Sequence, residues 1–354
     1  MSFSQKILLW YAENKRDLPW RSTRDPYKIW LSEIMLQQTR VAQGTPYYLK
    51  FLENFPTVKD LANAPEEKVL KLWQGLGYYS RARNLHTTAK IVTDRYKGKF
   101  PNTYKELVAL KGVGDYTASA IASICFDKAE PVVDGNVYRV LSRYFGVDIP
   151  INGTEGVKYF KQLAKKVMDT SEVRDYNQGI MEFGAIQCTP KKPYCLHCPL
   201  NDSCVALQKN TINSLPVKLN KMKIRNRYFN YLVPVISNEH LGKEKVNYST
   251  LLHKRNGKGI WQGLFEFPLL ESEEEIGLKE VKTRLKEFLD LKDMGKVYQH
   301  NEETIVHKLS HQHLHTKFWI VRTHTSFKDS IDLASLHTYP VPVLIADFIK
   351  TLKI

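Results

Sequence analysis

Four cysteines lie close together in the sequence and have side chains that can hold a metal centre. They are Cys188, Cys195, Cys198 and Cys204, separated by six, two and five residues. Four thiolates in one short loop must surround a single compact centre, and all-thiolate coordination suits an iron-sulfur cluster or structural zinc. Clustering of this kind predicts metal binding rather than disulfide bonds.

A second motif places two glycines between short helical segments. Gly112 and Gly114 separate the expected helices 104–110 and 115–126, which predicts a helix-hairpin-helix. Amides at the start of the second helix can bind a DNA phosphate without reading sequence, whereas the plainer interpretation is a simple helix connection.

Two carboxyl groups in contrasting contexts could carry acid and anion chemistry. Glu33 flanks the apolar stripe of a helix that Asp25 and Pro26 should begin, so we expect burial to raise its pKa. Asp134 precedes a helix that starts near Gly135, where free amides favour the ionised form. Taken singly, Glu33 is better explained as a solvated helix glutamate and Asp134 as a simple helix cap than as catalytic residues.

The elements that position these residues divide the chain into parts. Apolar residues recur at helical spacing up to about residue 210, and a basic linker without acidic residues is expected at 214–227. Beyond the linker, strands are expected at 231–236, 246–252 and 318–321, with helices at 276–289 and 341–352. Residues 228–354 should therefore form a separate α+β domain.

Composition narrows the class of partner. The chain has 354 residues, 43% of them hydrophobic, and a formal net charge of +15. This charge favours a polyanionic partner, either nucleic acid or an anionic membrane surface, and does not choose between them. No stretch approaches the roughly 20 apolar residues of a membrane span, and no secretion signal is evident. We therefore expect an intracellular protein that does not bind membranes.

Several blocks together resemble the MutY-type adenine DNA glycosylases of the endonuclease III, or helix-hairpin-helix, superfamily. The blocks are residues 17–39, 75–83, 110–118, 133–136 and the cysteine loop. The resemblance implies a mostly α fold with a C-terminal α+β domain. It places a six-helix barrel at 26–130 and an iron-sulfur helical domain at 1–25 and 131–213. It also favours one 4Fe-4S cluster over zinc, because the cysteine spacing is similar.

The resemblance further implies roles for individual residues. Glu33 would be the general acid that protonates adenine, and Asp134 would stabilise the C1′ cation, oriented by Tyr116 and Asn136. The adenine pocket would be built from Trp20, Arg21, Leu36 and Glu182. Gln38 and Tyr78 would fill the gap that the flipped base leaves in the stack.

Tyr116 bears on whether the enzyme also cuts the strand. Bifunctional relatives carry a lysine at this position, whose amine forms a Schiff base, and tyrosine cannot do so. The sequence therefore predicts a monofunctional glycosylase. A bifunctional glycosylase/lyase and a non-catalytic iron-sulfur DNA-binding protein are the alternatives.

The segment 263–268, Gly-Leu-Phe-Glu-Phe-Pro, resembles the Nudix fold. The metal-binding glutamate helix of Nudix hydrolases does not follow it, so pyrophosphate hydrolysis is not expected. Ser310 and His311 match a family loop that touches 8-oxoguanine, although Leu309 replaces its usual phenylalanine. His311, His313 and His315 alternate along an expected strand but lack an accompanying carboxylate or cysteine, which argues against a metal site.

The resemblance thus implies hydrolysis of adenine opposite 8-oxoguanine or guanine, in base excision repair. The expected partner is double-stranded DNA with such a mispair. The expected state is a monomer, cytoplasmic in a bacterium and associated with the nucleoid when bound to DNA.

Overall fold

The computed structural model describes residues 1–219, 224–237, 248–291 and 295–352, except for the side chain of Glu287. These residues form two units, Met1–Ala64 with Arg83–Asn220 and Pro65–Ala82 with Lys221–Ile354. The further division of the helical region into barrel and iron-sulfur domains stays a prediction. None of the helices in the described part of the chain is both long enough and apolar enough to cross a membrane.

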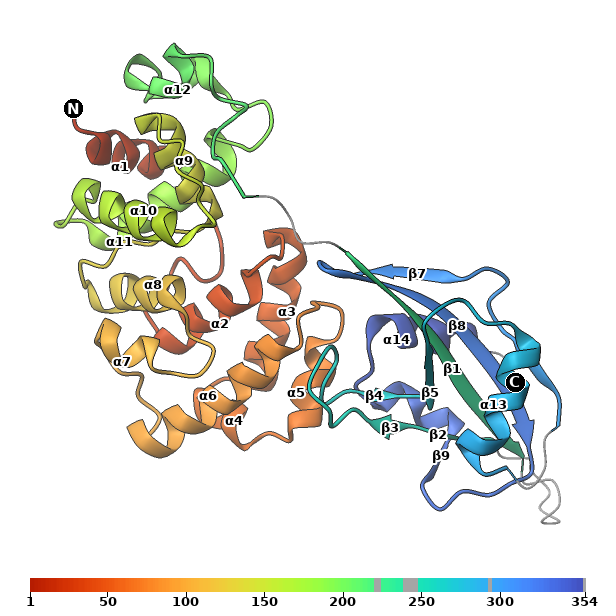
Figure 1. Ribbon diagram of the computed structural model, residues 1–354. Helices are drawn as coiled ribbons and strands as arrows, with labels where there is room; N and C mark the ends of the chain where they lie inside the picture. Colours follow the sequence, from red (N-terminus) through yellow and green to blue (C-terminus); the bar gives the residue numbers. More distant parts are fainter. Residues whose placement is uncertain (220–223, 238–247, 292–294, 353–354) are drawn as a thin grey trace. The chain divides into compact units, whose positions relative to one another are not determined.

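The first unit is built of helices, as the apolar periodicity predicts (Figure 1). Its α-helices are α1 Phe3–Asn14, α2 Pro26–Leu36, α3 Val41–Asn54, α4 Val58–Asn63, α6 Ser80–Tyr96, α7 Tyr104–Val108, α8 Asp115–Phe126, α9 Gly135–Phe145, α10 Thr154–Val167, α11 Val173–Glu182 and α12 Val205–Gln208, of which α6 begins in the second unit. Helix α11 packs against α1, α8 and α9, and α8 also packs against α2 and α7. The elements that carry Glu33, Tyr116 and Asp134 therefore share one core.

The helix starts follow from residues that the sequence analysis singles out. The Asp25 side chain accepts a hydrogen bond from the Tyr27 amide at 2.9 Å, and Pro26 is the first residue of α2. Asp134 caps α9 in the same way. Helix α7 ends at Val108, two residues before the expected end of the first hairpin helix, whereas α8 has the expected bounds.

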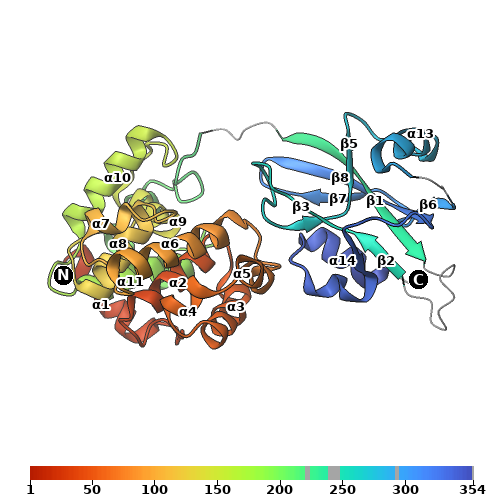
Figure 2. The ribbon, with the colours of Figure 1, turned by 90° about the horizontal axis from the view of Figure 1, so that it is seen from below.

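The second unit holds a seven-stranded sheet in the order β6-β8-β1-β2-β9, with β5 paired to β1 and β7 paired to β8 (Figure 2). The strands are β1 Arg225–Ser237, β2 Tyr248–Leu251, β5 Leu269–Ser272, β6 Val297–Gln299, β7 Ile305–Lys308, β8 Gln312–Thr323 and β9 Ser330–Asp332, with a separate pair β3 His253–Lys254 and β4 Phe265–Glu266. β1 starts within the expected linker, at Arg225. Val246 and Asn247, expected to be strand, lie outside the described residues.

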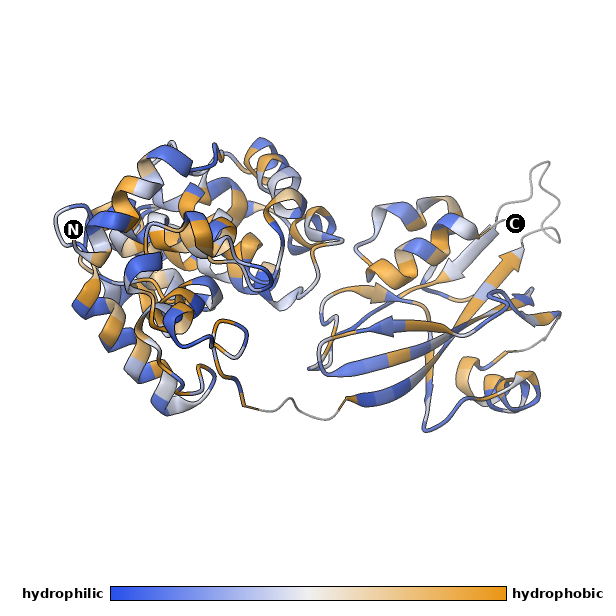
Figure 3. Cartoon of the chain, turned by 90° about the horizontal axis from the view of Figure 1, so that it is seen from above, coloured by the Kyte–Doolittle hydropathy of each residue, from blue (hydrophilic) through white to orange (hydrophobic). Residues whose placement is uncertain are grey.

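The two faces of this sheet are covered by different helices because side chains alternate along a strand. Leu232, Trp319 and Val321 pack against α13 Leu278–Leu289, while Phe318 stacks on Phe348 of α14 Val343–Thr351. β1 starts hydrophilic and becomes hydrophobic farther along (Figure 3). Helix α5 Glu66–Trp73 belongs to the same unit, where the Lys71 ammonium donates to the Tyr339 carbonyl.

Candidate active site

A pocket of about 580 Å³ opens in the helical unit and brings together nine of the residues singled out from the sequence. Its lining includes Trp20, Arg21, Glu33, Leu36, Gln38, Tyr116, Asp134, Asn136 and Glu182. They come from the α1–α2 connection, α2 and the residues after it, α8, α9 and α11. One concave site with several convergent polar groups is the arrangement expected of an active site.

Glu33 lies on α2, half-buried at the pocket wall, and its Oε2 atom accepts a hydrogen bond from the Tyr116 hydroxyl at 2.6 Å. Burial raises the pKa of Glu33 to about 7, the Tyr116 hydrogen bond lowers it, and the Asp134 charge raises it further. Burial also raises the pKa of Tyr116, so this phenol stays protonated and donates. A substantial fraction of Glu33 is therefore neutral near pH 7 and can release a proton.

Asp134 sits in a different hydrogen-bonding environment at the start of α9. Its Oδ1 atom accepts from the amides of Asn136 and Val137 at 2.9 and 2.8 Å, and its Oδ2 atom accepts from Nδ2 of Asn136 at 2.8 Å. Burial raises the pKa of Asp134 above its usual value, and these hydrogen bonds lower it in part. Three N–H donors converge on this carboxylate and only one hydroxyl on Glu33, so the site stabilises negative charge preferentially at Asp134.

A buried arginine that the sequence analysis did not single out supports this arrangement. Arg139 Nη2 donates to Oδ1 of Asn136 at 2.8 Å, which turns the amide nitrogen of Asn136 toward Asp134. The same guanidinium donates to the carbonyls of Gly184 and Cys188 at 2.6 and 2.7 Å. Arg139 lies on the opposite face of α9 from the apolar stripe of Val137, Val140 and Leu141, so no local sequence signal identifies it.

The far wall of the pocket is an ion-pair cluster around Glu182. Its carboxylate accepts from the guanidinium groups of Arg16 and Arg21 at distances between 2.6 and 3.0 Å. Burial alone would raise the pKa of Glu182, but these hydrogen bonds lower it to about 2. Glu182 is thus ionised, and its ion pairs hold the wall of the pocket together. Arg16 is a second residue that the sequence analysis missed.

Trp20 and Leu36 supply apolar surface beside this polar wall. Trp20 is buried and meets the ring of Tyr48 edge to face, with centroids 5.3 Å apart. Trp20 is therefore both a core contact and a pocket wall. Gln38, exposed at the pocket, has a positive φ of 55°.

In the hairpin only one glycine is required by internal geometry. Gly112 has φ +76°, and a Cβ there would come within 2.6 Å of the Asn84 side chain. A Cβ at Gly114 would meet nothing within 4 Å, so this position is open to approach from outside.

The four clustered cysteines lie between α11 and α12, all partly exposed and none in a disulfide. They interact electrostatically with one another, and Nη1 of Arg143 is 3.5 Å from the sulfur of Cys188. Among the described residues, no group of three or more His, Cys, Asp or Glu side chains has the geometry of a metal site. The donor set itself, four thiols that would repel each other as thiolates, fits a cationic all-thiolate centre.

The residues expected to recognise the lesion lie in the second unit. The tight turn between β7 and β8 carries Ser310 and His311, and the Leu309 amide donates to the Gln312 carbonyl at 2.8 Å. The hydroxyls of Tyr78 and Ser310 are hydrogen bonded. Tyr78 is exposed and has φ 46°. Two residues expected from separate motifs therefore meet within one unit.

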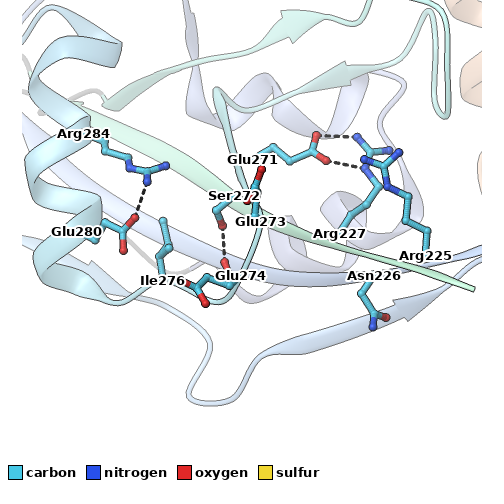
Figure 4. Close-up of a pocket in the computed structure, with 10 residues that line it drawn as sticks. All are labelled: Arg225, Asn226, Arg227, Glu271, Ser272, Glu273, Glu274, Ile276, Glu280 and Arg284. Carbon is cyan, nitrogen blue, oxygen red and sulfur yellow. Dashed lines mark hydrogen bonds and ion pairs between the residues drawn. The ribbon is translucent and has the colours of Figure 1, made fainter.

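A second pocket of about 510 Å³ lies between β1, β5 and α13 (Figure 4). Its carboxylates face arginines: Glu271 is bound by both nitrogens of the Arg227 fork at 2.6 and 2.7 Å, and Glu280 pairs with Arg284 at 2.6 Å. These two carboxylates already have cationic partners, in contrast to Glu33 and Asp134 of the helical pocket.

Two family models match the chain. The model described as "HhH-GPD superfamily base excision DNA repair protein" matches residues 31–167, and a "NUDIX domain" model matches residues 244–351. The fold class expected from the sequence is therefore confirmed, with a helical glycosylase fold followed by a Nudix-like domain.

Curated relatives extend over most of the chain. The adenine DNA glycosylase of Buchnera aphidicola subsp. Baizongia pistaciae is 36% identical over 327 residues, which cover 90% of this chain and 86% of the relative. That of Arabidopsis thaliana is 38% identical over 76% of this chain and 47% of its own length. The Homo sapiens adenine DNA glycosylase is 44% identical over 59% of this chain and 40% of its own.

Solved structures resemble the helical part. A thermostable thymine-DNA glycosylase has a TM-score of 0.55 and 34% identity, over 58% of this chain and 95% of its own. A non-covalent endonuclease III–DNA complex has a TM-score of 0.50 and 25% identity, over 59% of this chain and 99% of that chain.

Proposed function

Since this chain belongs to the adenine DNA glycosylase family, we propose that it hydrolyses the N-glycosidic bond of adenine in mispaired DNA, with Glu33 as the proton donor and Asp134 as the anion beside the deoxyribose. The observation that carries this proposal is the contrast between the two carboxyl groups of the pocket. Glu33 has a pKa of about 7, while three N–H donors stabilise negative charge on Asp134.

The chemistry needs both states at once. Cleavage of a purine N-glycosidic bond passes through an oxocarbenium-like transition state, so the departing base needs a proton and the sugar needs a nearby negative charge. Neutral Glu33 supplies the proton to the purine ring. Ionised Asp134 stabilises the developing charge at C1′, and Asn136 and Arg139 hold its carboxylate in place.

The reaction ends at an abasic site and does not continue to strand cleavage. A lyase needs an amine that forms a Schiff base with the sugar. None of the residues that line the pocket, all of them described, is a lysine, and Tyr116 is committed to the hydrogen bond with Glu33. This lining supports monofunctional hydrolysis over the glycosylase/lyase alternative.

The base opposite adenine is 8-oxoguanine or guanine. Tyr78 and Ser310, hydrogen bonded to one another, would meet the lesion together, with His311 in the same turn. Gln38 would fill the space that the flipped adenine leaves. Leu309 offers no aromatic ring for stacking on the lesion.

Cys188, Cys195, Cys198 and Cys204 hold one 4Fe-4S cluster. Bound there, the cluster would provide a rigid cross-link between α11 and α12, with no position open to substrate. Arg139 donates to the Cys188 carbonyl and to the Asn136 amide group, so the cysteine loop and Asp134 share a support. The protein acts as a monomer on double-stranded DNA in the bacterial cytoplasm.

Single-turnover adenine release tests this function. Duplexes carrying adenine opposite 8-oxoguanine, guanine or cytosine are compared, with and without alkali, and a thymine·guanine duplex serves as control. We expect release from the first two only, with strand breaks that require alkali. Strand breaks without alkali would support the lyase alternative, and binding without release the non-catalytic one.

The lesion contact has its own test. Replacing Ser310 with alanine removes the hydroxyl that meets Tyr78, and the rate ratio between 8-oxoguanine and guanine substrates should fall by about tenfold or less, the worth of one hydrogen bond. An unchanged ratio would remove Ser310 from lesion recognition.

A further inference from the structure

A lysine outside the pocket connects the two segments that carry the acid and the anion. Lys161 lies on α10 Thr154–Val167, which packs beside α9 (Figure 1). Its ammonium group reaches the Asp115 carboxylate at the start of α8. Helix α8 carries Tyr116, the hydrogen-bond partner of Glu33. We propose that Lys161 is a positioning residue that fixes the spacing between the Glu33–Tyr116 pair and Asp134, and this inference rests on the roles given above to those residues.

The ammonium group has three N–H bonds, and each finds an acceptor. Nζ of Lys161 lies 3.1 Å from the Asp115 carboxylate, 2.8 Å from the Ser119 hydroxyl and 2.9 Å from the Pro131 carbonyl. A fully satisfied ammonium group defines a single geometry, unlike a lone surface ion pair.

These acceptors belong to two segments, the start of α8 that carries Tyr116 and the residues that lead into Asp134. Asp115 and Ser119 lie in the first turns of α8, on either side of Tyr116 along the chain. Pro131 is buried in the segment that leads into Asp134, three residues later. Lys161 therefore ties the residue next to Tyr116 to the segment that carries Asp134.

Lys161 also compensates the charge of Asp115, an acidic residue at the start of α8. Asp115 begins the helix whose amides are expected to face a DNA phosphate, and its carboxylate is half-exposed. The Tyr104 hydroxyl donates to the same carboxylate at 2.6 Å. Without Lys161, the uncompensated charge would oppose DNA binding, and this effect is separable from positioning.

The test compares three variants in the full-length protein. Lys161→Met keeps an apolar stem of similar length but removes every donor, Lys161→Arg keeps the charge, and Lys165→Met makes the same charge change at an exposed position one turn away. Because a displacement of about 1 Å in an active site can cost roughly 100-fold in rate, we expect Lys161→Met to slow single-turnover adenine release by about 10- to 100-fold. Lys161→Arg should recover most of that loss, and Lys165→Met should match the unmodified protein.

A double variant separates positioning from charge. Asp115→Asn combined with Lys161→Met removes the uncompensated carboxylate, so affinity for a duplex that contains a non-cleavable adenine analogue should return to the starting value. The cleavage rate should stay low, since the ties to Ser119 and Pro131 are still missing. Recovery of the rate together with affinity would overturn the positioning role.

The pH profile supplies a readout that simple loss of stability would not move. If Tyr116 shifts away from Glu33, the hydrogen bond that lowers the Glu33 pKa weakens, and the alkaline limb of the rate profile should move to higher pH in Lys161→Met. An unmoved limb with an unreduced rate would refute the inference about Lys161. Failure of the unmodified protein to release adenine would instead refute the proposed function.

Discussion

The helical pocket and the sheet pocket described above use carboxylates in opposite ways. In the helical unit, Glu33 and Asp134 receive hydrogen bonds from a hydroxyl, an amide side chain and backbone amides. In the sheet unit, Glu271 and Glu280 are each paired with an arginine and remain 38% and 44% exposed. Both pockets are comparable in size, so volume does not distinguish them.

What distinguishes them is whether charge is compensated. An arginine guanidinium that donates two hydrogen bonds to a carboxylate keeps the carboxylate ionised and in one geometry, which suits a structural role. A buried carboxyl with neutral donors can change its protonation state, which suits proton transfer. Glu182 shows that the rule applies within one pocket: it is almost fully buried, yet two arginines hold its pKa at about 2.

The strongest test of the contrast replaces Glu33 with glutamine. The amide fills the same space and can accept from Tyr116 but has no proton to transfer, so the single-turnover rate should fall by about 10³-fold, within the range for loss of a general acid. Duplex affinity should change little.

Glu13, exposed on α1, provides a matched control. Glu13→Gln makes the same chemical change away from the pocket and should leave the rate unaltered. If Glu33→Gln released adenine as fast as this control, Glu33 would have no part in the mechanism.

The second test addresses the paired carboxylate of the same pocket. Glu182→Gln leaves the Arg16 and Arg21 guanidinium groups without their counter-charge, so the free energy of unfolding should fall by about 3 kcal/mol, the scale for breaking a buried ion pair. Urea denaturation monitored by circular dichroism measures this. A change below about 1 kcal/mol, typical of surface pairs, would place Glu182 with the sheet-pocket carboxylates.

The third test uses the pH dependence of stability. Burial raises the pKa of Glu33 from the usual 4.5 of a glutamate to about 7, so the folded protein keeps a proton that the unfolded chain releases between these values. Stability from this group is present at pH 4.5 and is lost as pH rises to 7, with an upper limit of about 3 kcal/mol. Glutamine does not titrate, so Glu33→Gln should lack this pH dependence of stability.

The measurement is a pair of unfolding curves for each protein. The free energy of unfolding of Glu33→Gln minus that of the unmodified chain should be larger at pH 8 than at pH 5. An equal difference at both pH values would mean that Glu33 titrates as an exposed glutamate.

Local sequence signals predicted several of the features that position the residues of the helical pocket. Asp25 and Asp134 each cap the helix that follows directly, and the two hairpin glycines are separated by one residue. Each of these signals is local, so the spacing of residues along the chain identifies it. Family resemblance added pocket residues such as Trp20 and Glu182, which lie far apart in the chain.

The supporting side chains were beyond reach of such signals. Arg16, Arg139 and Lys161 act through carbonyls and carboxylates that only tertiary packing brings near, and none belongs to a short motif. The strands β6, β7 and β9 were missed for a related reason. Segments of three or four residues are too short to show alternation, and their pairing partner β8 or β2 decides their conformation.

The smallest change in the free energy of unfolding is expected for a carboxylate of the sheet pocket. Glu271→Gln breaks the fork with Arg227, but both groups are partly open to water, so unfolding should change by less than about 1 kcal/mol. The change should also shrink in high salt, because exposed charges are screened. Adenine release from 8-oxoguanine duplexes should be unaffected, since this carboxylate lies outside the reacting pocket. A loss as large as that of Glu182→Gln would show that pairing with arginine, irrespective of burial, determines how much a carboxylate stabilises this protein.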